Sequence, residues 1–162
     1  MTISVGDRLP DAKLHLMTDA GFELVSLADR LKGRKVVIFG LPGAYTGTCT
    51  TAHVPSFIRV REKLAARGVD EVICLSVNDA FVMKAWGEAT GATKAGITML
   101  GDADSSFSKA IGLVFSLPEK GFFDRSKRYA LYAEDGVVKV LHHGQETSAC
   151  EISGGEAMLE AL

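Results

Sequence analysis

The chain has 162 residues, of which 47% are hydrophobic and 23% are charged, and its 18 Lys and Arg residues stand against 20 Asp and Glu residues. This length and composition predict one globular domain, residues 1–162, with a single continuous core. Because there is no excess of positive charge, we expect no binding to nucleic acid or to a membrane surface.

The first half of the chain predicts strands around a long helix. Alternating apolar residues at 12–17 and 22–25 predict an N-terminal hairpin. Continuous apolar runs at 36–40 and 72–77 predict two parallel strands that are covered on both faces. Helical spacing of apolar residues between these runs, from residue 54 to 65, predicts the helix that connects them.

A second helix is expected after the strand at 72–77. Asn78 or Asp79 is its predicted N-cap, and the helix should end before Gly91. Its buried face is predicted from four apolar residues, which are Phe81, Val82, Ala85 and Trp86.

The last third of the chain predicts smaller elements. We expect a short strand at 98–100, a short helix at 105–111, and a hairpin of strands 129–133 and 137–141 around an Asp-Gly turn. Capping-box spacing at 153–156 predicts a closing helix. The order of elements predicts an α/β protein of thioredoxin-like fold, with a central mixed β-sheet flanked by helices and an N-terminal hairpin extension.

The stretch 42–53, which reads PGAYTGTCTTAH, places a thiol where an α/β sheet usually binds ligands. Cys49 would lie in the first turn of a helix, where free N–H groups and the helix dipole stabilise a thiolate. Thr46 is three residues before it, within reach of the sulfur or of an approaching oxygen, and His53 is four residues after it, where it could anchor the loop or line a pocket. An inert thiol beside an exposed His is the plain alternative.

The same stretch resembles the peroxidatic motif P-x-x-x-T-x-x-C of the peroxiredoxins, and its continuation resembles their type II, peroxiredoxin 5-like subfamily. Further landmarks of that subfamily lie at 73–79, 81–83, 85–86, 101–102 and 128–130. The resemblance implies a thiol-dependent peroxidase that reduces hydrogen peroxide and organic (alkyl) hydroperoxides without a metal, haem, flavin or other cofactor.

The resemblance also implies the roles of individual residues. Cys49 would be oxidised to a sulfenic acid, Thr46 would hydrogen-bond the peroxide, Pro42 would shield the pocket, and Arg128 would lower the thiol pKa and stabilise the transition state. The residues expected to support the loop or line the pocket are Gly43, Thr48 and His53. The sequence departs from the family at Gly47, where Pro is common, so we expect a more flexible loop.

The two remaining cysteines leave the route of recycling open. Cys74 lies in an apolar run and reads as a buried hydrophobe, although it matches the second cysteine of plant type II members. Cys150 is near the resolving cysteine of atypical two-cysteine members, but residues 145–149 do not resemble theirs. We favour a one-cysteine cycle in which glutathione, glutaredoxin or thioredoxin is the reductant.

Three further expectations concern context. The resemblance implies a homodimer formed through the face near Cys49, and the N-terminus, which does not read as a signal peptide, indicates a cytoplasmic protein. A thiol-based redox sensor or binding module on the same fold is the alternative function. A zinc site at Cys49 and His53 is a weaker one, because zinc usually takes three or four protein ligands.

Overall fold

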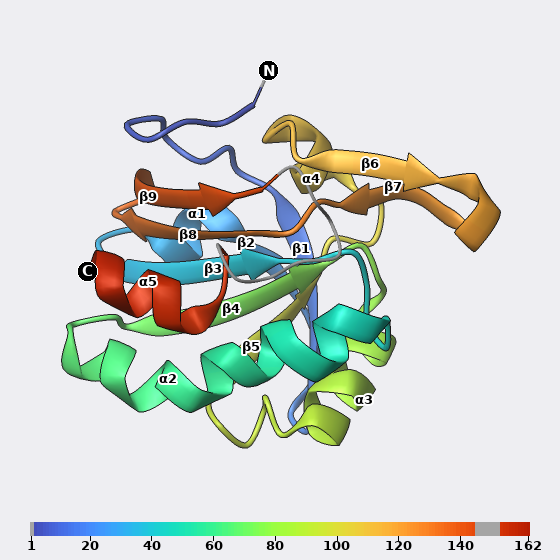
Figure 1. Ribbon diagram of the computed structural model, residues 1–162, viewed down its shortest axis with the longest axis horizontal. Helices are drawn as coiled ribbons and strands as arrows, with labels where there is room; N and C mark the ends of the chain where they lie inside the picture. The colour runs from blue at the N-terminus through green and yellow to red at the C-terminus, as the bar shows by residue number, and fades with distance from the viewer. Residues whose placement is uncertain (1, 145–152) are drawn as a thin grey trace.

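The computed structural model describes residues 2–144 and 153–162. Its centre is a seven-stranded mixed sheet in the order β2-β1-β5-β4-β3-β8-β9 (Figure 1). Strands β3, β4 and β5 are parallel, and all the other pairs are antiparallel. The strand bounds are β1 Lys13–Thr18, β2 Gly21–Ser26, β3 Lys35–Gly40, β4 Glu71–Ser76, β5 Ile97–Gly101, β8 Tyr129–Glu134 and β9 Val137–His143.

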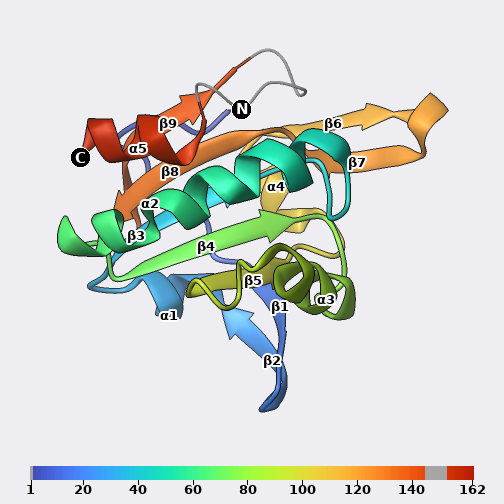
Figure 2. The ribbon, with the colours of Figure 1, turned by 60° about the horizontal axis from the view of Figure 1, so that its bottom comes forward.

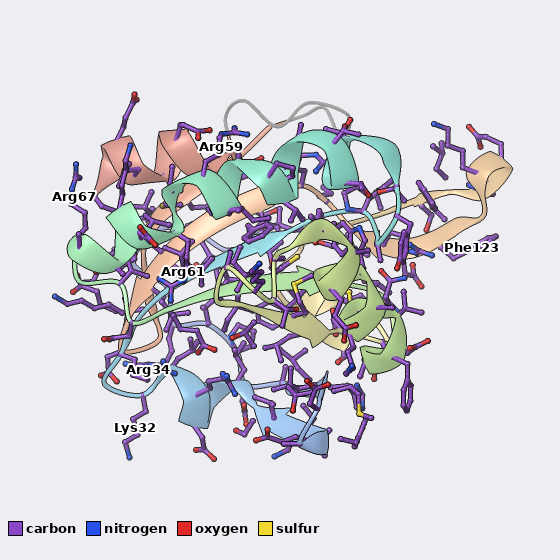
Figure 3. The ribbon with its side chains drawn as sticks, turned by 90° about the horizontal axis from the view of Figure 1, so that it is seen from below. Lys32, Arg34, Arg59, Arg61, Arg67 and Phe123 are labelled. Carbon is purple, nitrogen blue, oxygen red and sulfur yellow. The ribbon has the colours of Figure 1, made fainter. Side chains whose placement is uncertain are left out.

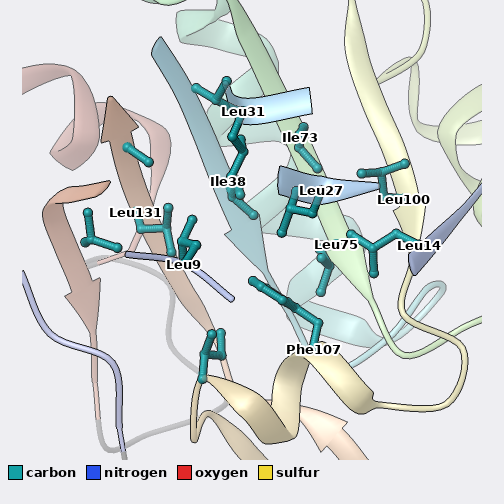
Figure 4. Close-up of a cluster of buried hydrophobic side chains, with 14 of the residues drawn as sticks. Leu9, Leu14, Leu27, Leu31, Ile38, Ile73, Leu75, Leu100, Phe107 and Leu131 are labelled. Carbon is teal, nitrogen blue, oxygen red and sulfur yellow. The ribbon is translucent and has the colours of Figure 1, made fainter. Parts of the chain in front are cut away.

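Helices cover both faces of this sheet (Figure 2). On one face, α2 (Val54–Ala66), α3 (Ala80–Thr90) and α5 (Gly155–Ala161) bury apolar side chains against β3 and β4. On the other face, α1 (Leu27–Leu31) and α4 (Ser106–Ala110) close a second cluster, in which Leu27, Ile38 and Phe107 are buried (Figure 4). The predicted thioredoxin-like α/β fold, including both hairpins, is confirmed. In the described residues no helix has the length and apolar character needed to cross a membrane.

A second, two-stranded sheet projects from the body of the molecule (Figure 1). It pairs β6 (Val114–Leu117) with β7 (Phe122–Ser126) through the 3₁₀-helix η2 (Pro118–Lys120). Phe123 lies on this hairpin and is exposed (Figure 3). Neither this hairpin nor α1 was predicted from the sequence.

The predicted buried face of α3 is wrong except at Trp86. Its buried residues are Ala80, Met83, Trp86 and Gly87, whereas Phe81 is 62% exposed. The close approach of α3 to β5 explains this orientation, because a Cβ on Gly87 would lie 2.7 Å from the Met99 side chain. Asp79 is the N-cap and Gly91 the left-handed C-cap, both within the predicted limits.

The predicted capping box at 153–156 is also wrong. Gly154 is the N-cap of α5 and has no side chain that could cap the helix, and the amide of Gly155 donates to the Ser56 hydroxyl of α2 instead. Glu156 pairs with Arg59 of α2 at 3.0 Å. Arg59 and Arg67 both extend from α2 on the side that faces α5 (Figure 3), and Arg67 donates to the carbonyls of Leu159 and Leu162. Contacts with α2 therefore hold α5 in place.

Candidate active site

The loop of residues 41–48 leaves the carboxyl end of β3 and leads into the first helical turn before α2. The amide of Ala44 donates a hydrogen bond to the side-chain oxygen of Asn78 at 3.0 Å, which ties the loop to the segment after β4. Within the loop, the Thr46 hydroxyl donates to the carbonyl of Gly43 at 2.7 Å. Two hydrogen bonds therefore fix the loop, one to the segment after β4 and one within the loop itself. The loop lies at the carboxyl ends of the parallel strands, where α/β sheets usually bind ligands.

The turn that begins at Cys49 is a π-helix, η1 (Cys49–His53), within a helical segment that starts at Gly47, so the predicted place of Cys49 in the first turn of a helix is confirmed. The indole N–H of Trp86 donates to the Thr50 hydroxyl at 3.2 Å and so fastens this turn to α3. The turn contains no acidic residue. A π-helical turn is rare and often marks a functional site, and here it begins at Cys49, two residues after the start of the helical segment at Gly47.

His53 ends this π-helix and is fully buried. Its Nδ1 lies 2.9 Å from Nη1 of Arg128, and its Nε2 lies 2.9 Å from the carbonyl oxygen of Ser153. Burial, with a smaller contribution from the charge of Arg128, lowers the pKa of His53 to about 3. The imidazole is therefore neutral near pH 7, and the plain alternative of an exposed His is wrong.

Arg128 is itself buried, with 3% of its surface exposed. It lies between β7 and β8, directly before the first residue of β8. Strand β8 pairs with β3, and β3 leads into the 41–48 loop. This pairing brings together residues that are 75 positions apart in the sequence, His53 and Arg128.

A second arginine from the same region contacts the loop. Nη1 of Arg125, in β7, donates to the carbonyl of Pro42 at 3.0 Å, and the guanidinium lies 5.1 Å from the centre of the Phe122 ring. A Cβ on Gly43 would lie 2.4 Å from the same Nη1. Glycine at position 43 therefore lets Arg125 reach the Pro42 carbonyl.

The structure accounts for most of the site residues that the sequence suggests. Pro42 and Gly43 are buried, and Thr46 and Thr48 are half-buried. Gly47 is exposed, and a Cβ there would meet nothing within 4 Å. Cys74 is fully buried within β4, opposite Phe39 in β3. Cys150 and residues 145–149 lie outside the described residues.

Three residues that position the site, Asn78, Arg125 and Ser153, were not predicted from the sequence. Asn78 was considered only as a helix cap, whereas it holds the loop. Arg125 precedes Arg128 by three residues, and a second arginine so close to an expected catalytic one was the available signal. The contact of Ser153 with His53 uses a backbone carbonyl, which leaves no signal in the side-chain sequence.

The zinc alternative is not supported. Both ring nitrogens of His53 already have partners at 2.9 Å, so the imidazole is not available as a ligand. In the parts of the chain that the structure describes, no group of three or more His, Cys, Asp or Glu residues could hold a metal ion.

A family model, curated sequences and solved structures all match this chain over nearly its whole length. The Redoxin family matches residues 4–159. The chain is 47% identical to Peroxiredoxin-2E-2, chloroplastic, from Oryza sativa subsp. japonica, over 99% of this chain and 73% of the rice protein. It is 43% identical to Peroxiredoxin-2C of the same organism, over 99% and 98% of the two chains. The structure of reduced Prx3 in complex with H2O2 from Vibrio vulnificus superimposes with a TM-score of 0.89 at 42% identity, covering 99% of each chain.

Proposed function

The chain belongs to the peroxiredoxin family within the redoxins and is a thiol-dependent peroxidase, and we propose that Cys49 is its peroxidatic residue. The observation that carries this proposal is the contact of a buried arginine, Arg128, with the π-helix that begins at Cys49. A guanidinium next to this turn favours the thiolate, which is the reactive form of cysteine.

The proposed reaction oxidises the sulfur by two electrons. The Cys49 thiolate attacks one oxygen of the peroxide, so that an S–O bond forms as the O–O bond breaks. The other oxygen leaves as hydroxide or alkoxide and takes up a proton to become water or an alcohol. Cys49 is left as a sulfenic acid.

The surrounding residues would stabilise the charge that develops on the leaving oxygen. Arg128 supplies a fixed positive charge in a buried position, which costs no reorganisation during the reaction. The Thr46 hydroxyl donates its proton to the carbonyl of Gly43, so its oxygen would bind the peroxide by accepting a hydrogen bond from the peroxide O–H. Pro42, which is buried and fixed by Arg125, would limit the access of water.

We propose that an external thiol reduces the sulfenic acid of Cys49. A first thiol, of glutathione, glutaredoxin or thioredoxin, condenses with the sulfenic acid to release water and form a mixed disulfide, and a second thiol restores Cys49. The burial of Cys74 within β4 supports this route over internal resolution by that residue, because its sulfur would need backbone movement to form a disulfide. Cytoplasmic location remains a prediction.

Intact mass measured after one equivalent of hydrogen peroxide tests these roles. Wild type should gain one oxygen, or a glutathione adduct when glutathione is present, and Cys49→Ser should gain neither. Cys74→Ser and Cys150→Ser should behave as wild type. A loss of two mass units that disappears in Cys150→Ser would instead show an internal disulfide, and wild-type peroxide consumption by Cys49→Ser would rule out the proposed mechanism.

Catalytic turnover separates the peroxidase from the sensor alternative. With an excess of glutathione and glutaredoxin, or of thioredoxin with its reductase, a peroxidase consumes many equivalents of peroxide per chain. A sensor stops at about one equivalent.

A further inference from the structure

The hydrogen bonds of His53 fix its tautomer. A guanidinium has only N–H donors, so Nδ1 of His53 must accept the bond from Arg128. The proton of the neutral ring is then on Nε2, which donates to the carbonyl of Ser153. Because a neutral imidazole carries no charge, this contact orients the guanidinium without neutralising it.

The aromatic side chains around His53 hold its ring in one orientation. The ring centres of Phe39 and Phe57 lie 5.1 Å and 5.7 Å from that of His53, and the two phenyl rings stack on each other at 4.1 Å. Since His53 is fully buried, a different ring orientation would have to displace one of these side chains.

The carbonyl of Ser153 is in turn fixed by the docking of α5 on α2. The amide of Gly155 donates to the Ser56 hydroxyl at 2.9 Å, and that hydroxyl donates to the carbonyl of His53 at 2.6 Å. A Cβ on Gly155 would lie 2.3 Å from the backbone oxygen of Ser56. Only glycine at position 155 therefore lets the start of α5 approach α2 this closely.

We propose that His53 is a positioning residue for the peroxidase reaction, which orients Arg128 through Nδ1 and is held through Nε2 by the C-terminal helix α5. The inference rests on the proposed roles of Cys49 and Arg128. It adds that the seating of α5, which is not part of the 41–48 loop, controls the rate at which Cys49 reacts with peroxide.

Substitutions of His53 test the first half of this proposal. In His53→Asn the side-chain oxygen can occupy the position of Nδ1 and accept from Arg128, whereas His53→Leu offers no acceptor. We expect His53→Leu to slow single-turnover oxidation by hydrogen peroxide on the order of 10-fold to 100-fold, as misplacement of a catalytic group by about 1 Å can do. His53→Asn should recover a large part of this loss.

The rate at which iodoacetamide alkylates Cys49 distinguishes a positioning role of His53 from a general structural effect, which would slow alkylation and peroxide oxidation alike. Alkylation needs the thiolate but no peroxide oxygen bound beside Arg128. We therefore expect a smaller loss of the alkylation rate than of the peroxide rate in His53→Leu. Equal losses of both rates would overturn the positioning role, as would an unchanged peroxide rate.

A double-mutant cycle shows whether His53 acts through Arg128. If it does, adding His53→Leu to Arg128→Lys should slow oxidation much less than it slows the wild type, because the guanidinium is already absent. Fully additive losses would overturn the proposal. Urea unfolding of each variant establishes that the compared proteins are folded at the assay temperature.

Gly155→Ala tests the role of α5 without changing any residue in contact with Arg128. The added methyl group must displace α5 from Ser56, so the peroxide rate should fall several-fold. Its matched control is Glu160→Gln, a substitution at an exposed position of the same helix, which should leave the rate unchanged. A wild-type rate in a folded Gly155→Ala protein would refute the link to α5.

The proposal and the function beneath it fail in different ways. If Cys49→Ser still consumed peroxide at the wild-type rate, the assignment of the nucleophile would be wrong. If Cys49→Ser were inactive while His53→Leu and Gly155→Ala matched wild type, only the positioning role would be wrong.

Discussion

Tyr129 is a buried residue whose polar group has no visible use. Its ring packs against Gly40, where a Cβ would lie 2.2 Å from a ring carbon, and among the described side chains its hydroxyl has no hydrogen-bond partner. Burial raises the pKa of this hydroxyl well above its ordinary value, so the group stays neutral.

We expect Tyr129→Phe to raise the free energy of unfolding by about 1 kcal/mol, because the variant no longer buries an unsatisfied hydroxyl. Urea denaturation measures this difference. Tyr132→Phe is the matched control, since it removes a hydroxyl that donates to Glu134 at 2.9 Å and should give no gain. A Tyr129→Phe protein less stable than wild type would mean that the hydroxyl is satisfied after all.

His53 makes the stability of the fold depend on pH. Its pKa is about 3 in the folded chain, against 6.5 for an unperturbed His. Above pH 6.5 both states are neutral at this residue. Below it, only the unfolded chain takes up the proton, so the folded state loses stability until the pH reaches about 3.

The expected loss from this group is about 1.4 kcal/mol per pH unit, or about 2 kcal/mol between pH 6.5 and 5. Urea denaturation at pH 7, 6 and 5 should show it in wild type and not in His53→Asn. His143→Asn, at an exposed position, should keep the wild-type dependence. If His53→Asn lost stability with falling pH as steeply as wild type, another group would be responsible.

At the scale of elements, the sequence predicted the strands and turns that depend on local residue patterns. Strands β3 and β4 are continuous apolar runs, and the β8–β9 hairpin has its turn at Asp135 and Gly136, both with positive φ. The π-helix η1 was not predictable in this way, since the bond from Trp86 to Thr50 that fastens it comes from another helix. The rotation of α3 likewise depends on a tertiary contact, at Gly87.

The residues of the candidate site likewise fall into those that the local sequence predicted and those that it did not. Its motif residues, Cys49 and Thr46, were visible because they are close in sequence, and Arg128 was found only through the family resemblance. The partners that hold them act through backbone carbonyls, as Ser153 does, or across long separations, as Arg125 does. Side-chain pattern carries little information about either kind of contact.

At the scale of the whole molecule, an exposed apolar surface lies beside the site. Phe81, in the first turn of α3, stacks on Phe22 of β2 with ring centres 6.4 Å apart, and both rings are more than half exposed. Tyr45, on the 41–48 loop, is also exposed and lies 6.4 Å from Trp86 of the same helix. Apolar side chains grouped in this way are typical of surfaces that bind another protein, and we propose that this surface forms the homodimer that the family resemblance predicts.

We expect wild type to sediment as a dimer at micromolar concentration and Phe81→Glu to shift the protein toward monomer, because the charge would be buried on association. Phe123→Glu is the matched control, since Phe123 is equally exposed but lies on the projecting hairpin (Figure 3). A monomeric wild type would contradict the proposed dimer, and dissociation by Phe123→Glu alone would move the interface to the hairpin.

The hydrogen bond between Trp86 and Thr50 places a natural fluorophore next to the turn that contains Cys49. Trp86 is the single tryptophan of the protein, and its indole is hydrogen-bonded to the residue that follows Cys49. All tryptophan emission therefore originates beside the oxidisable turn. When Trp86 is excited selectively over the three tyrosines, its emission should therefore report changes at this turn during oxidation and reduction without a label.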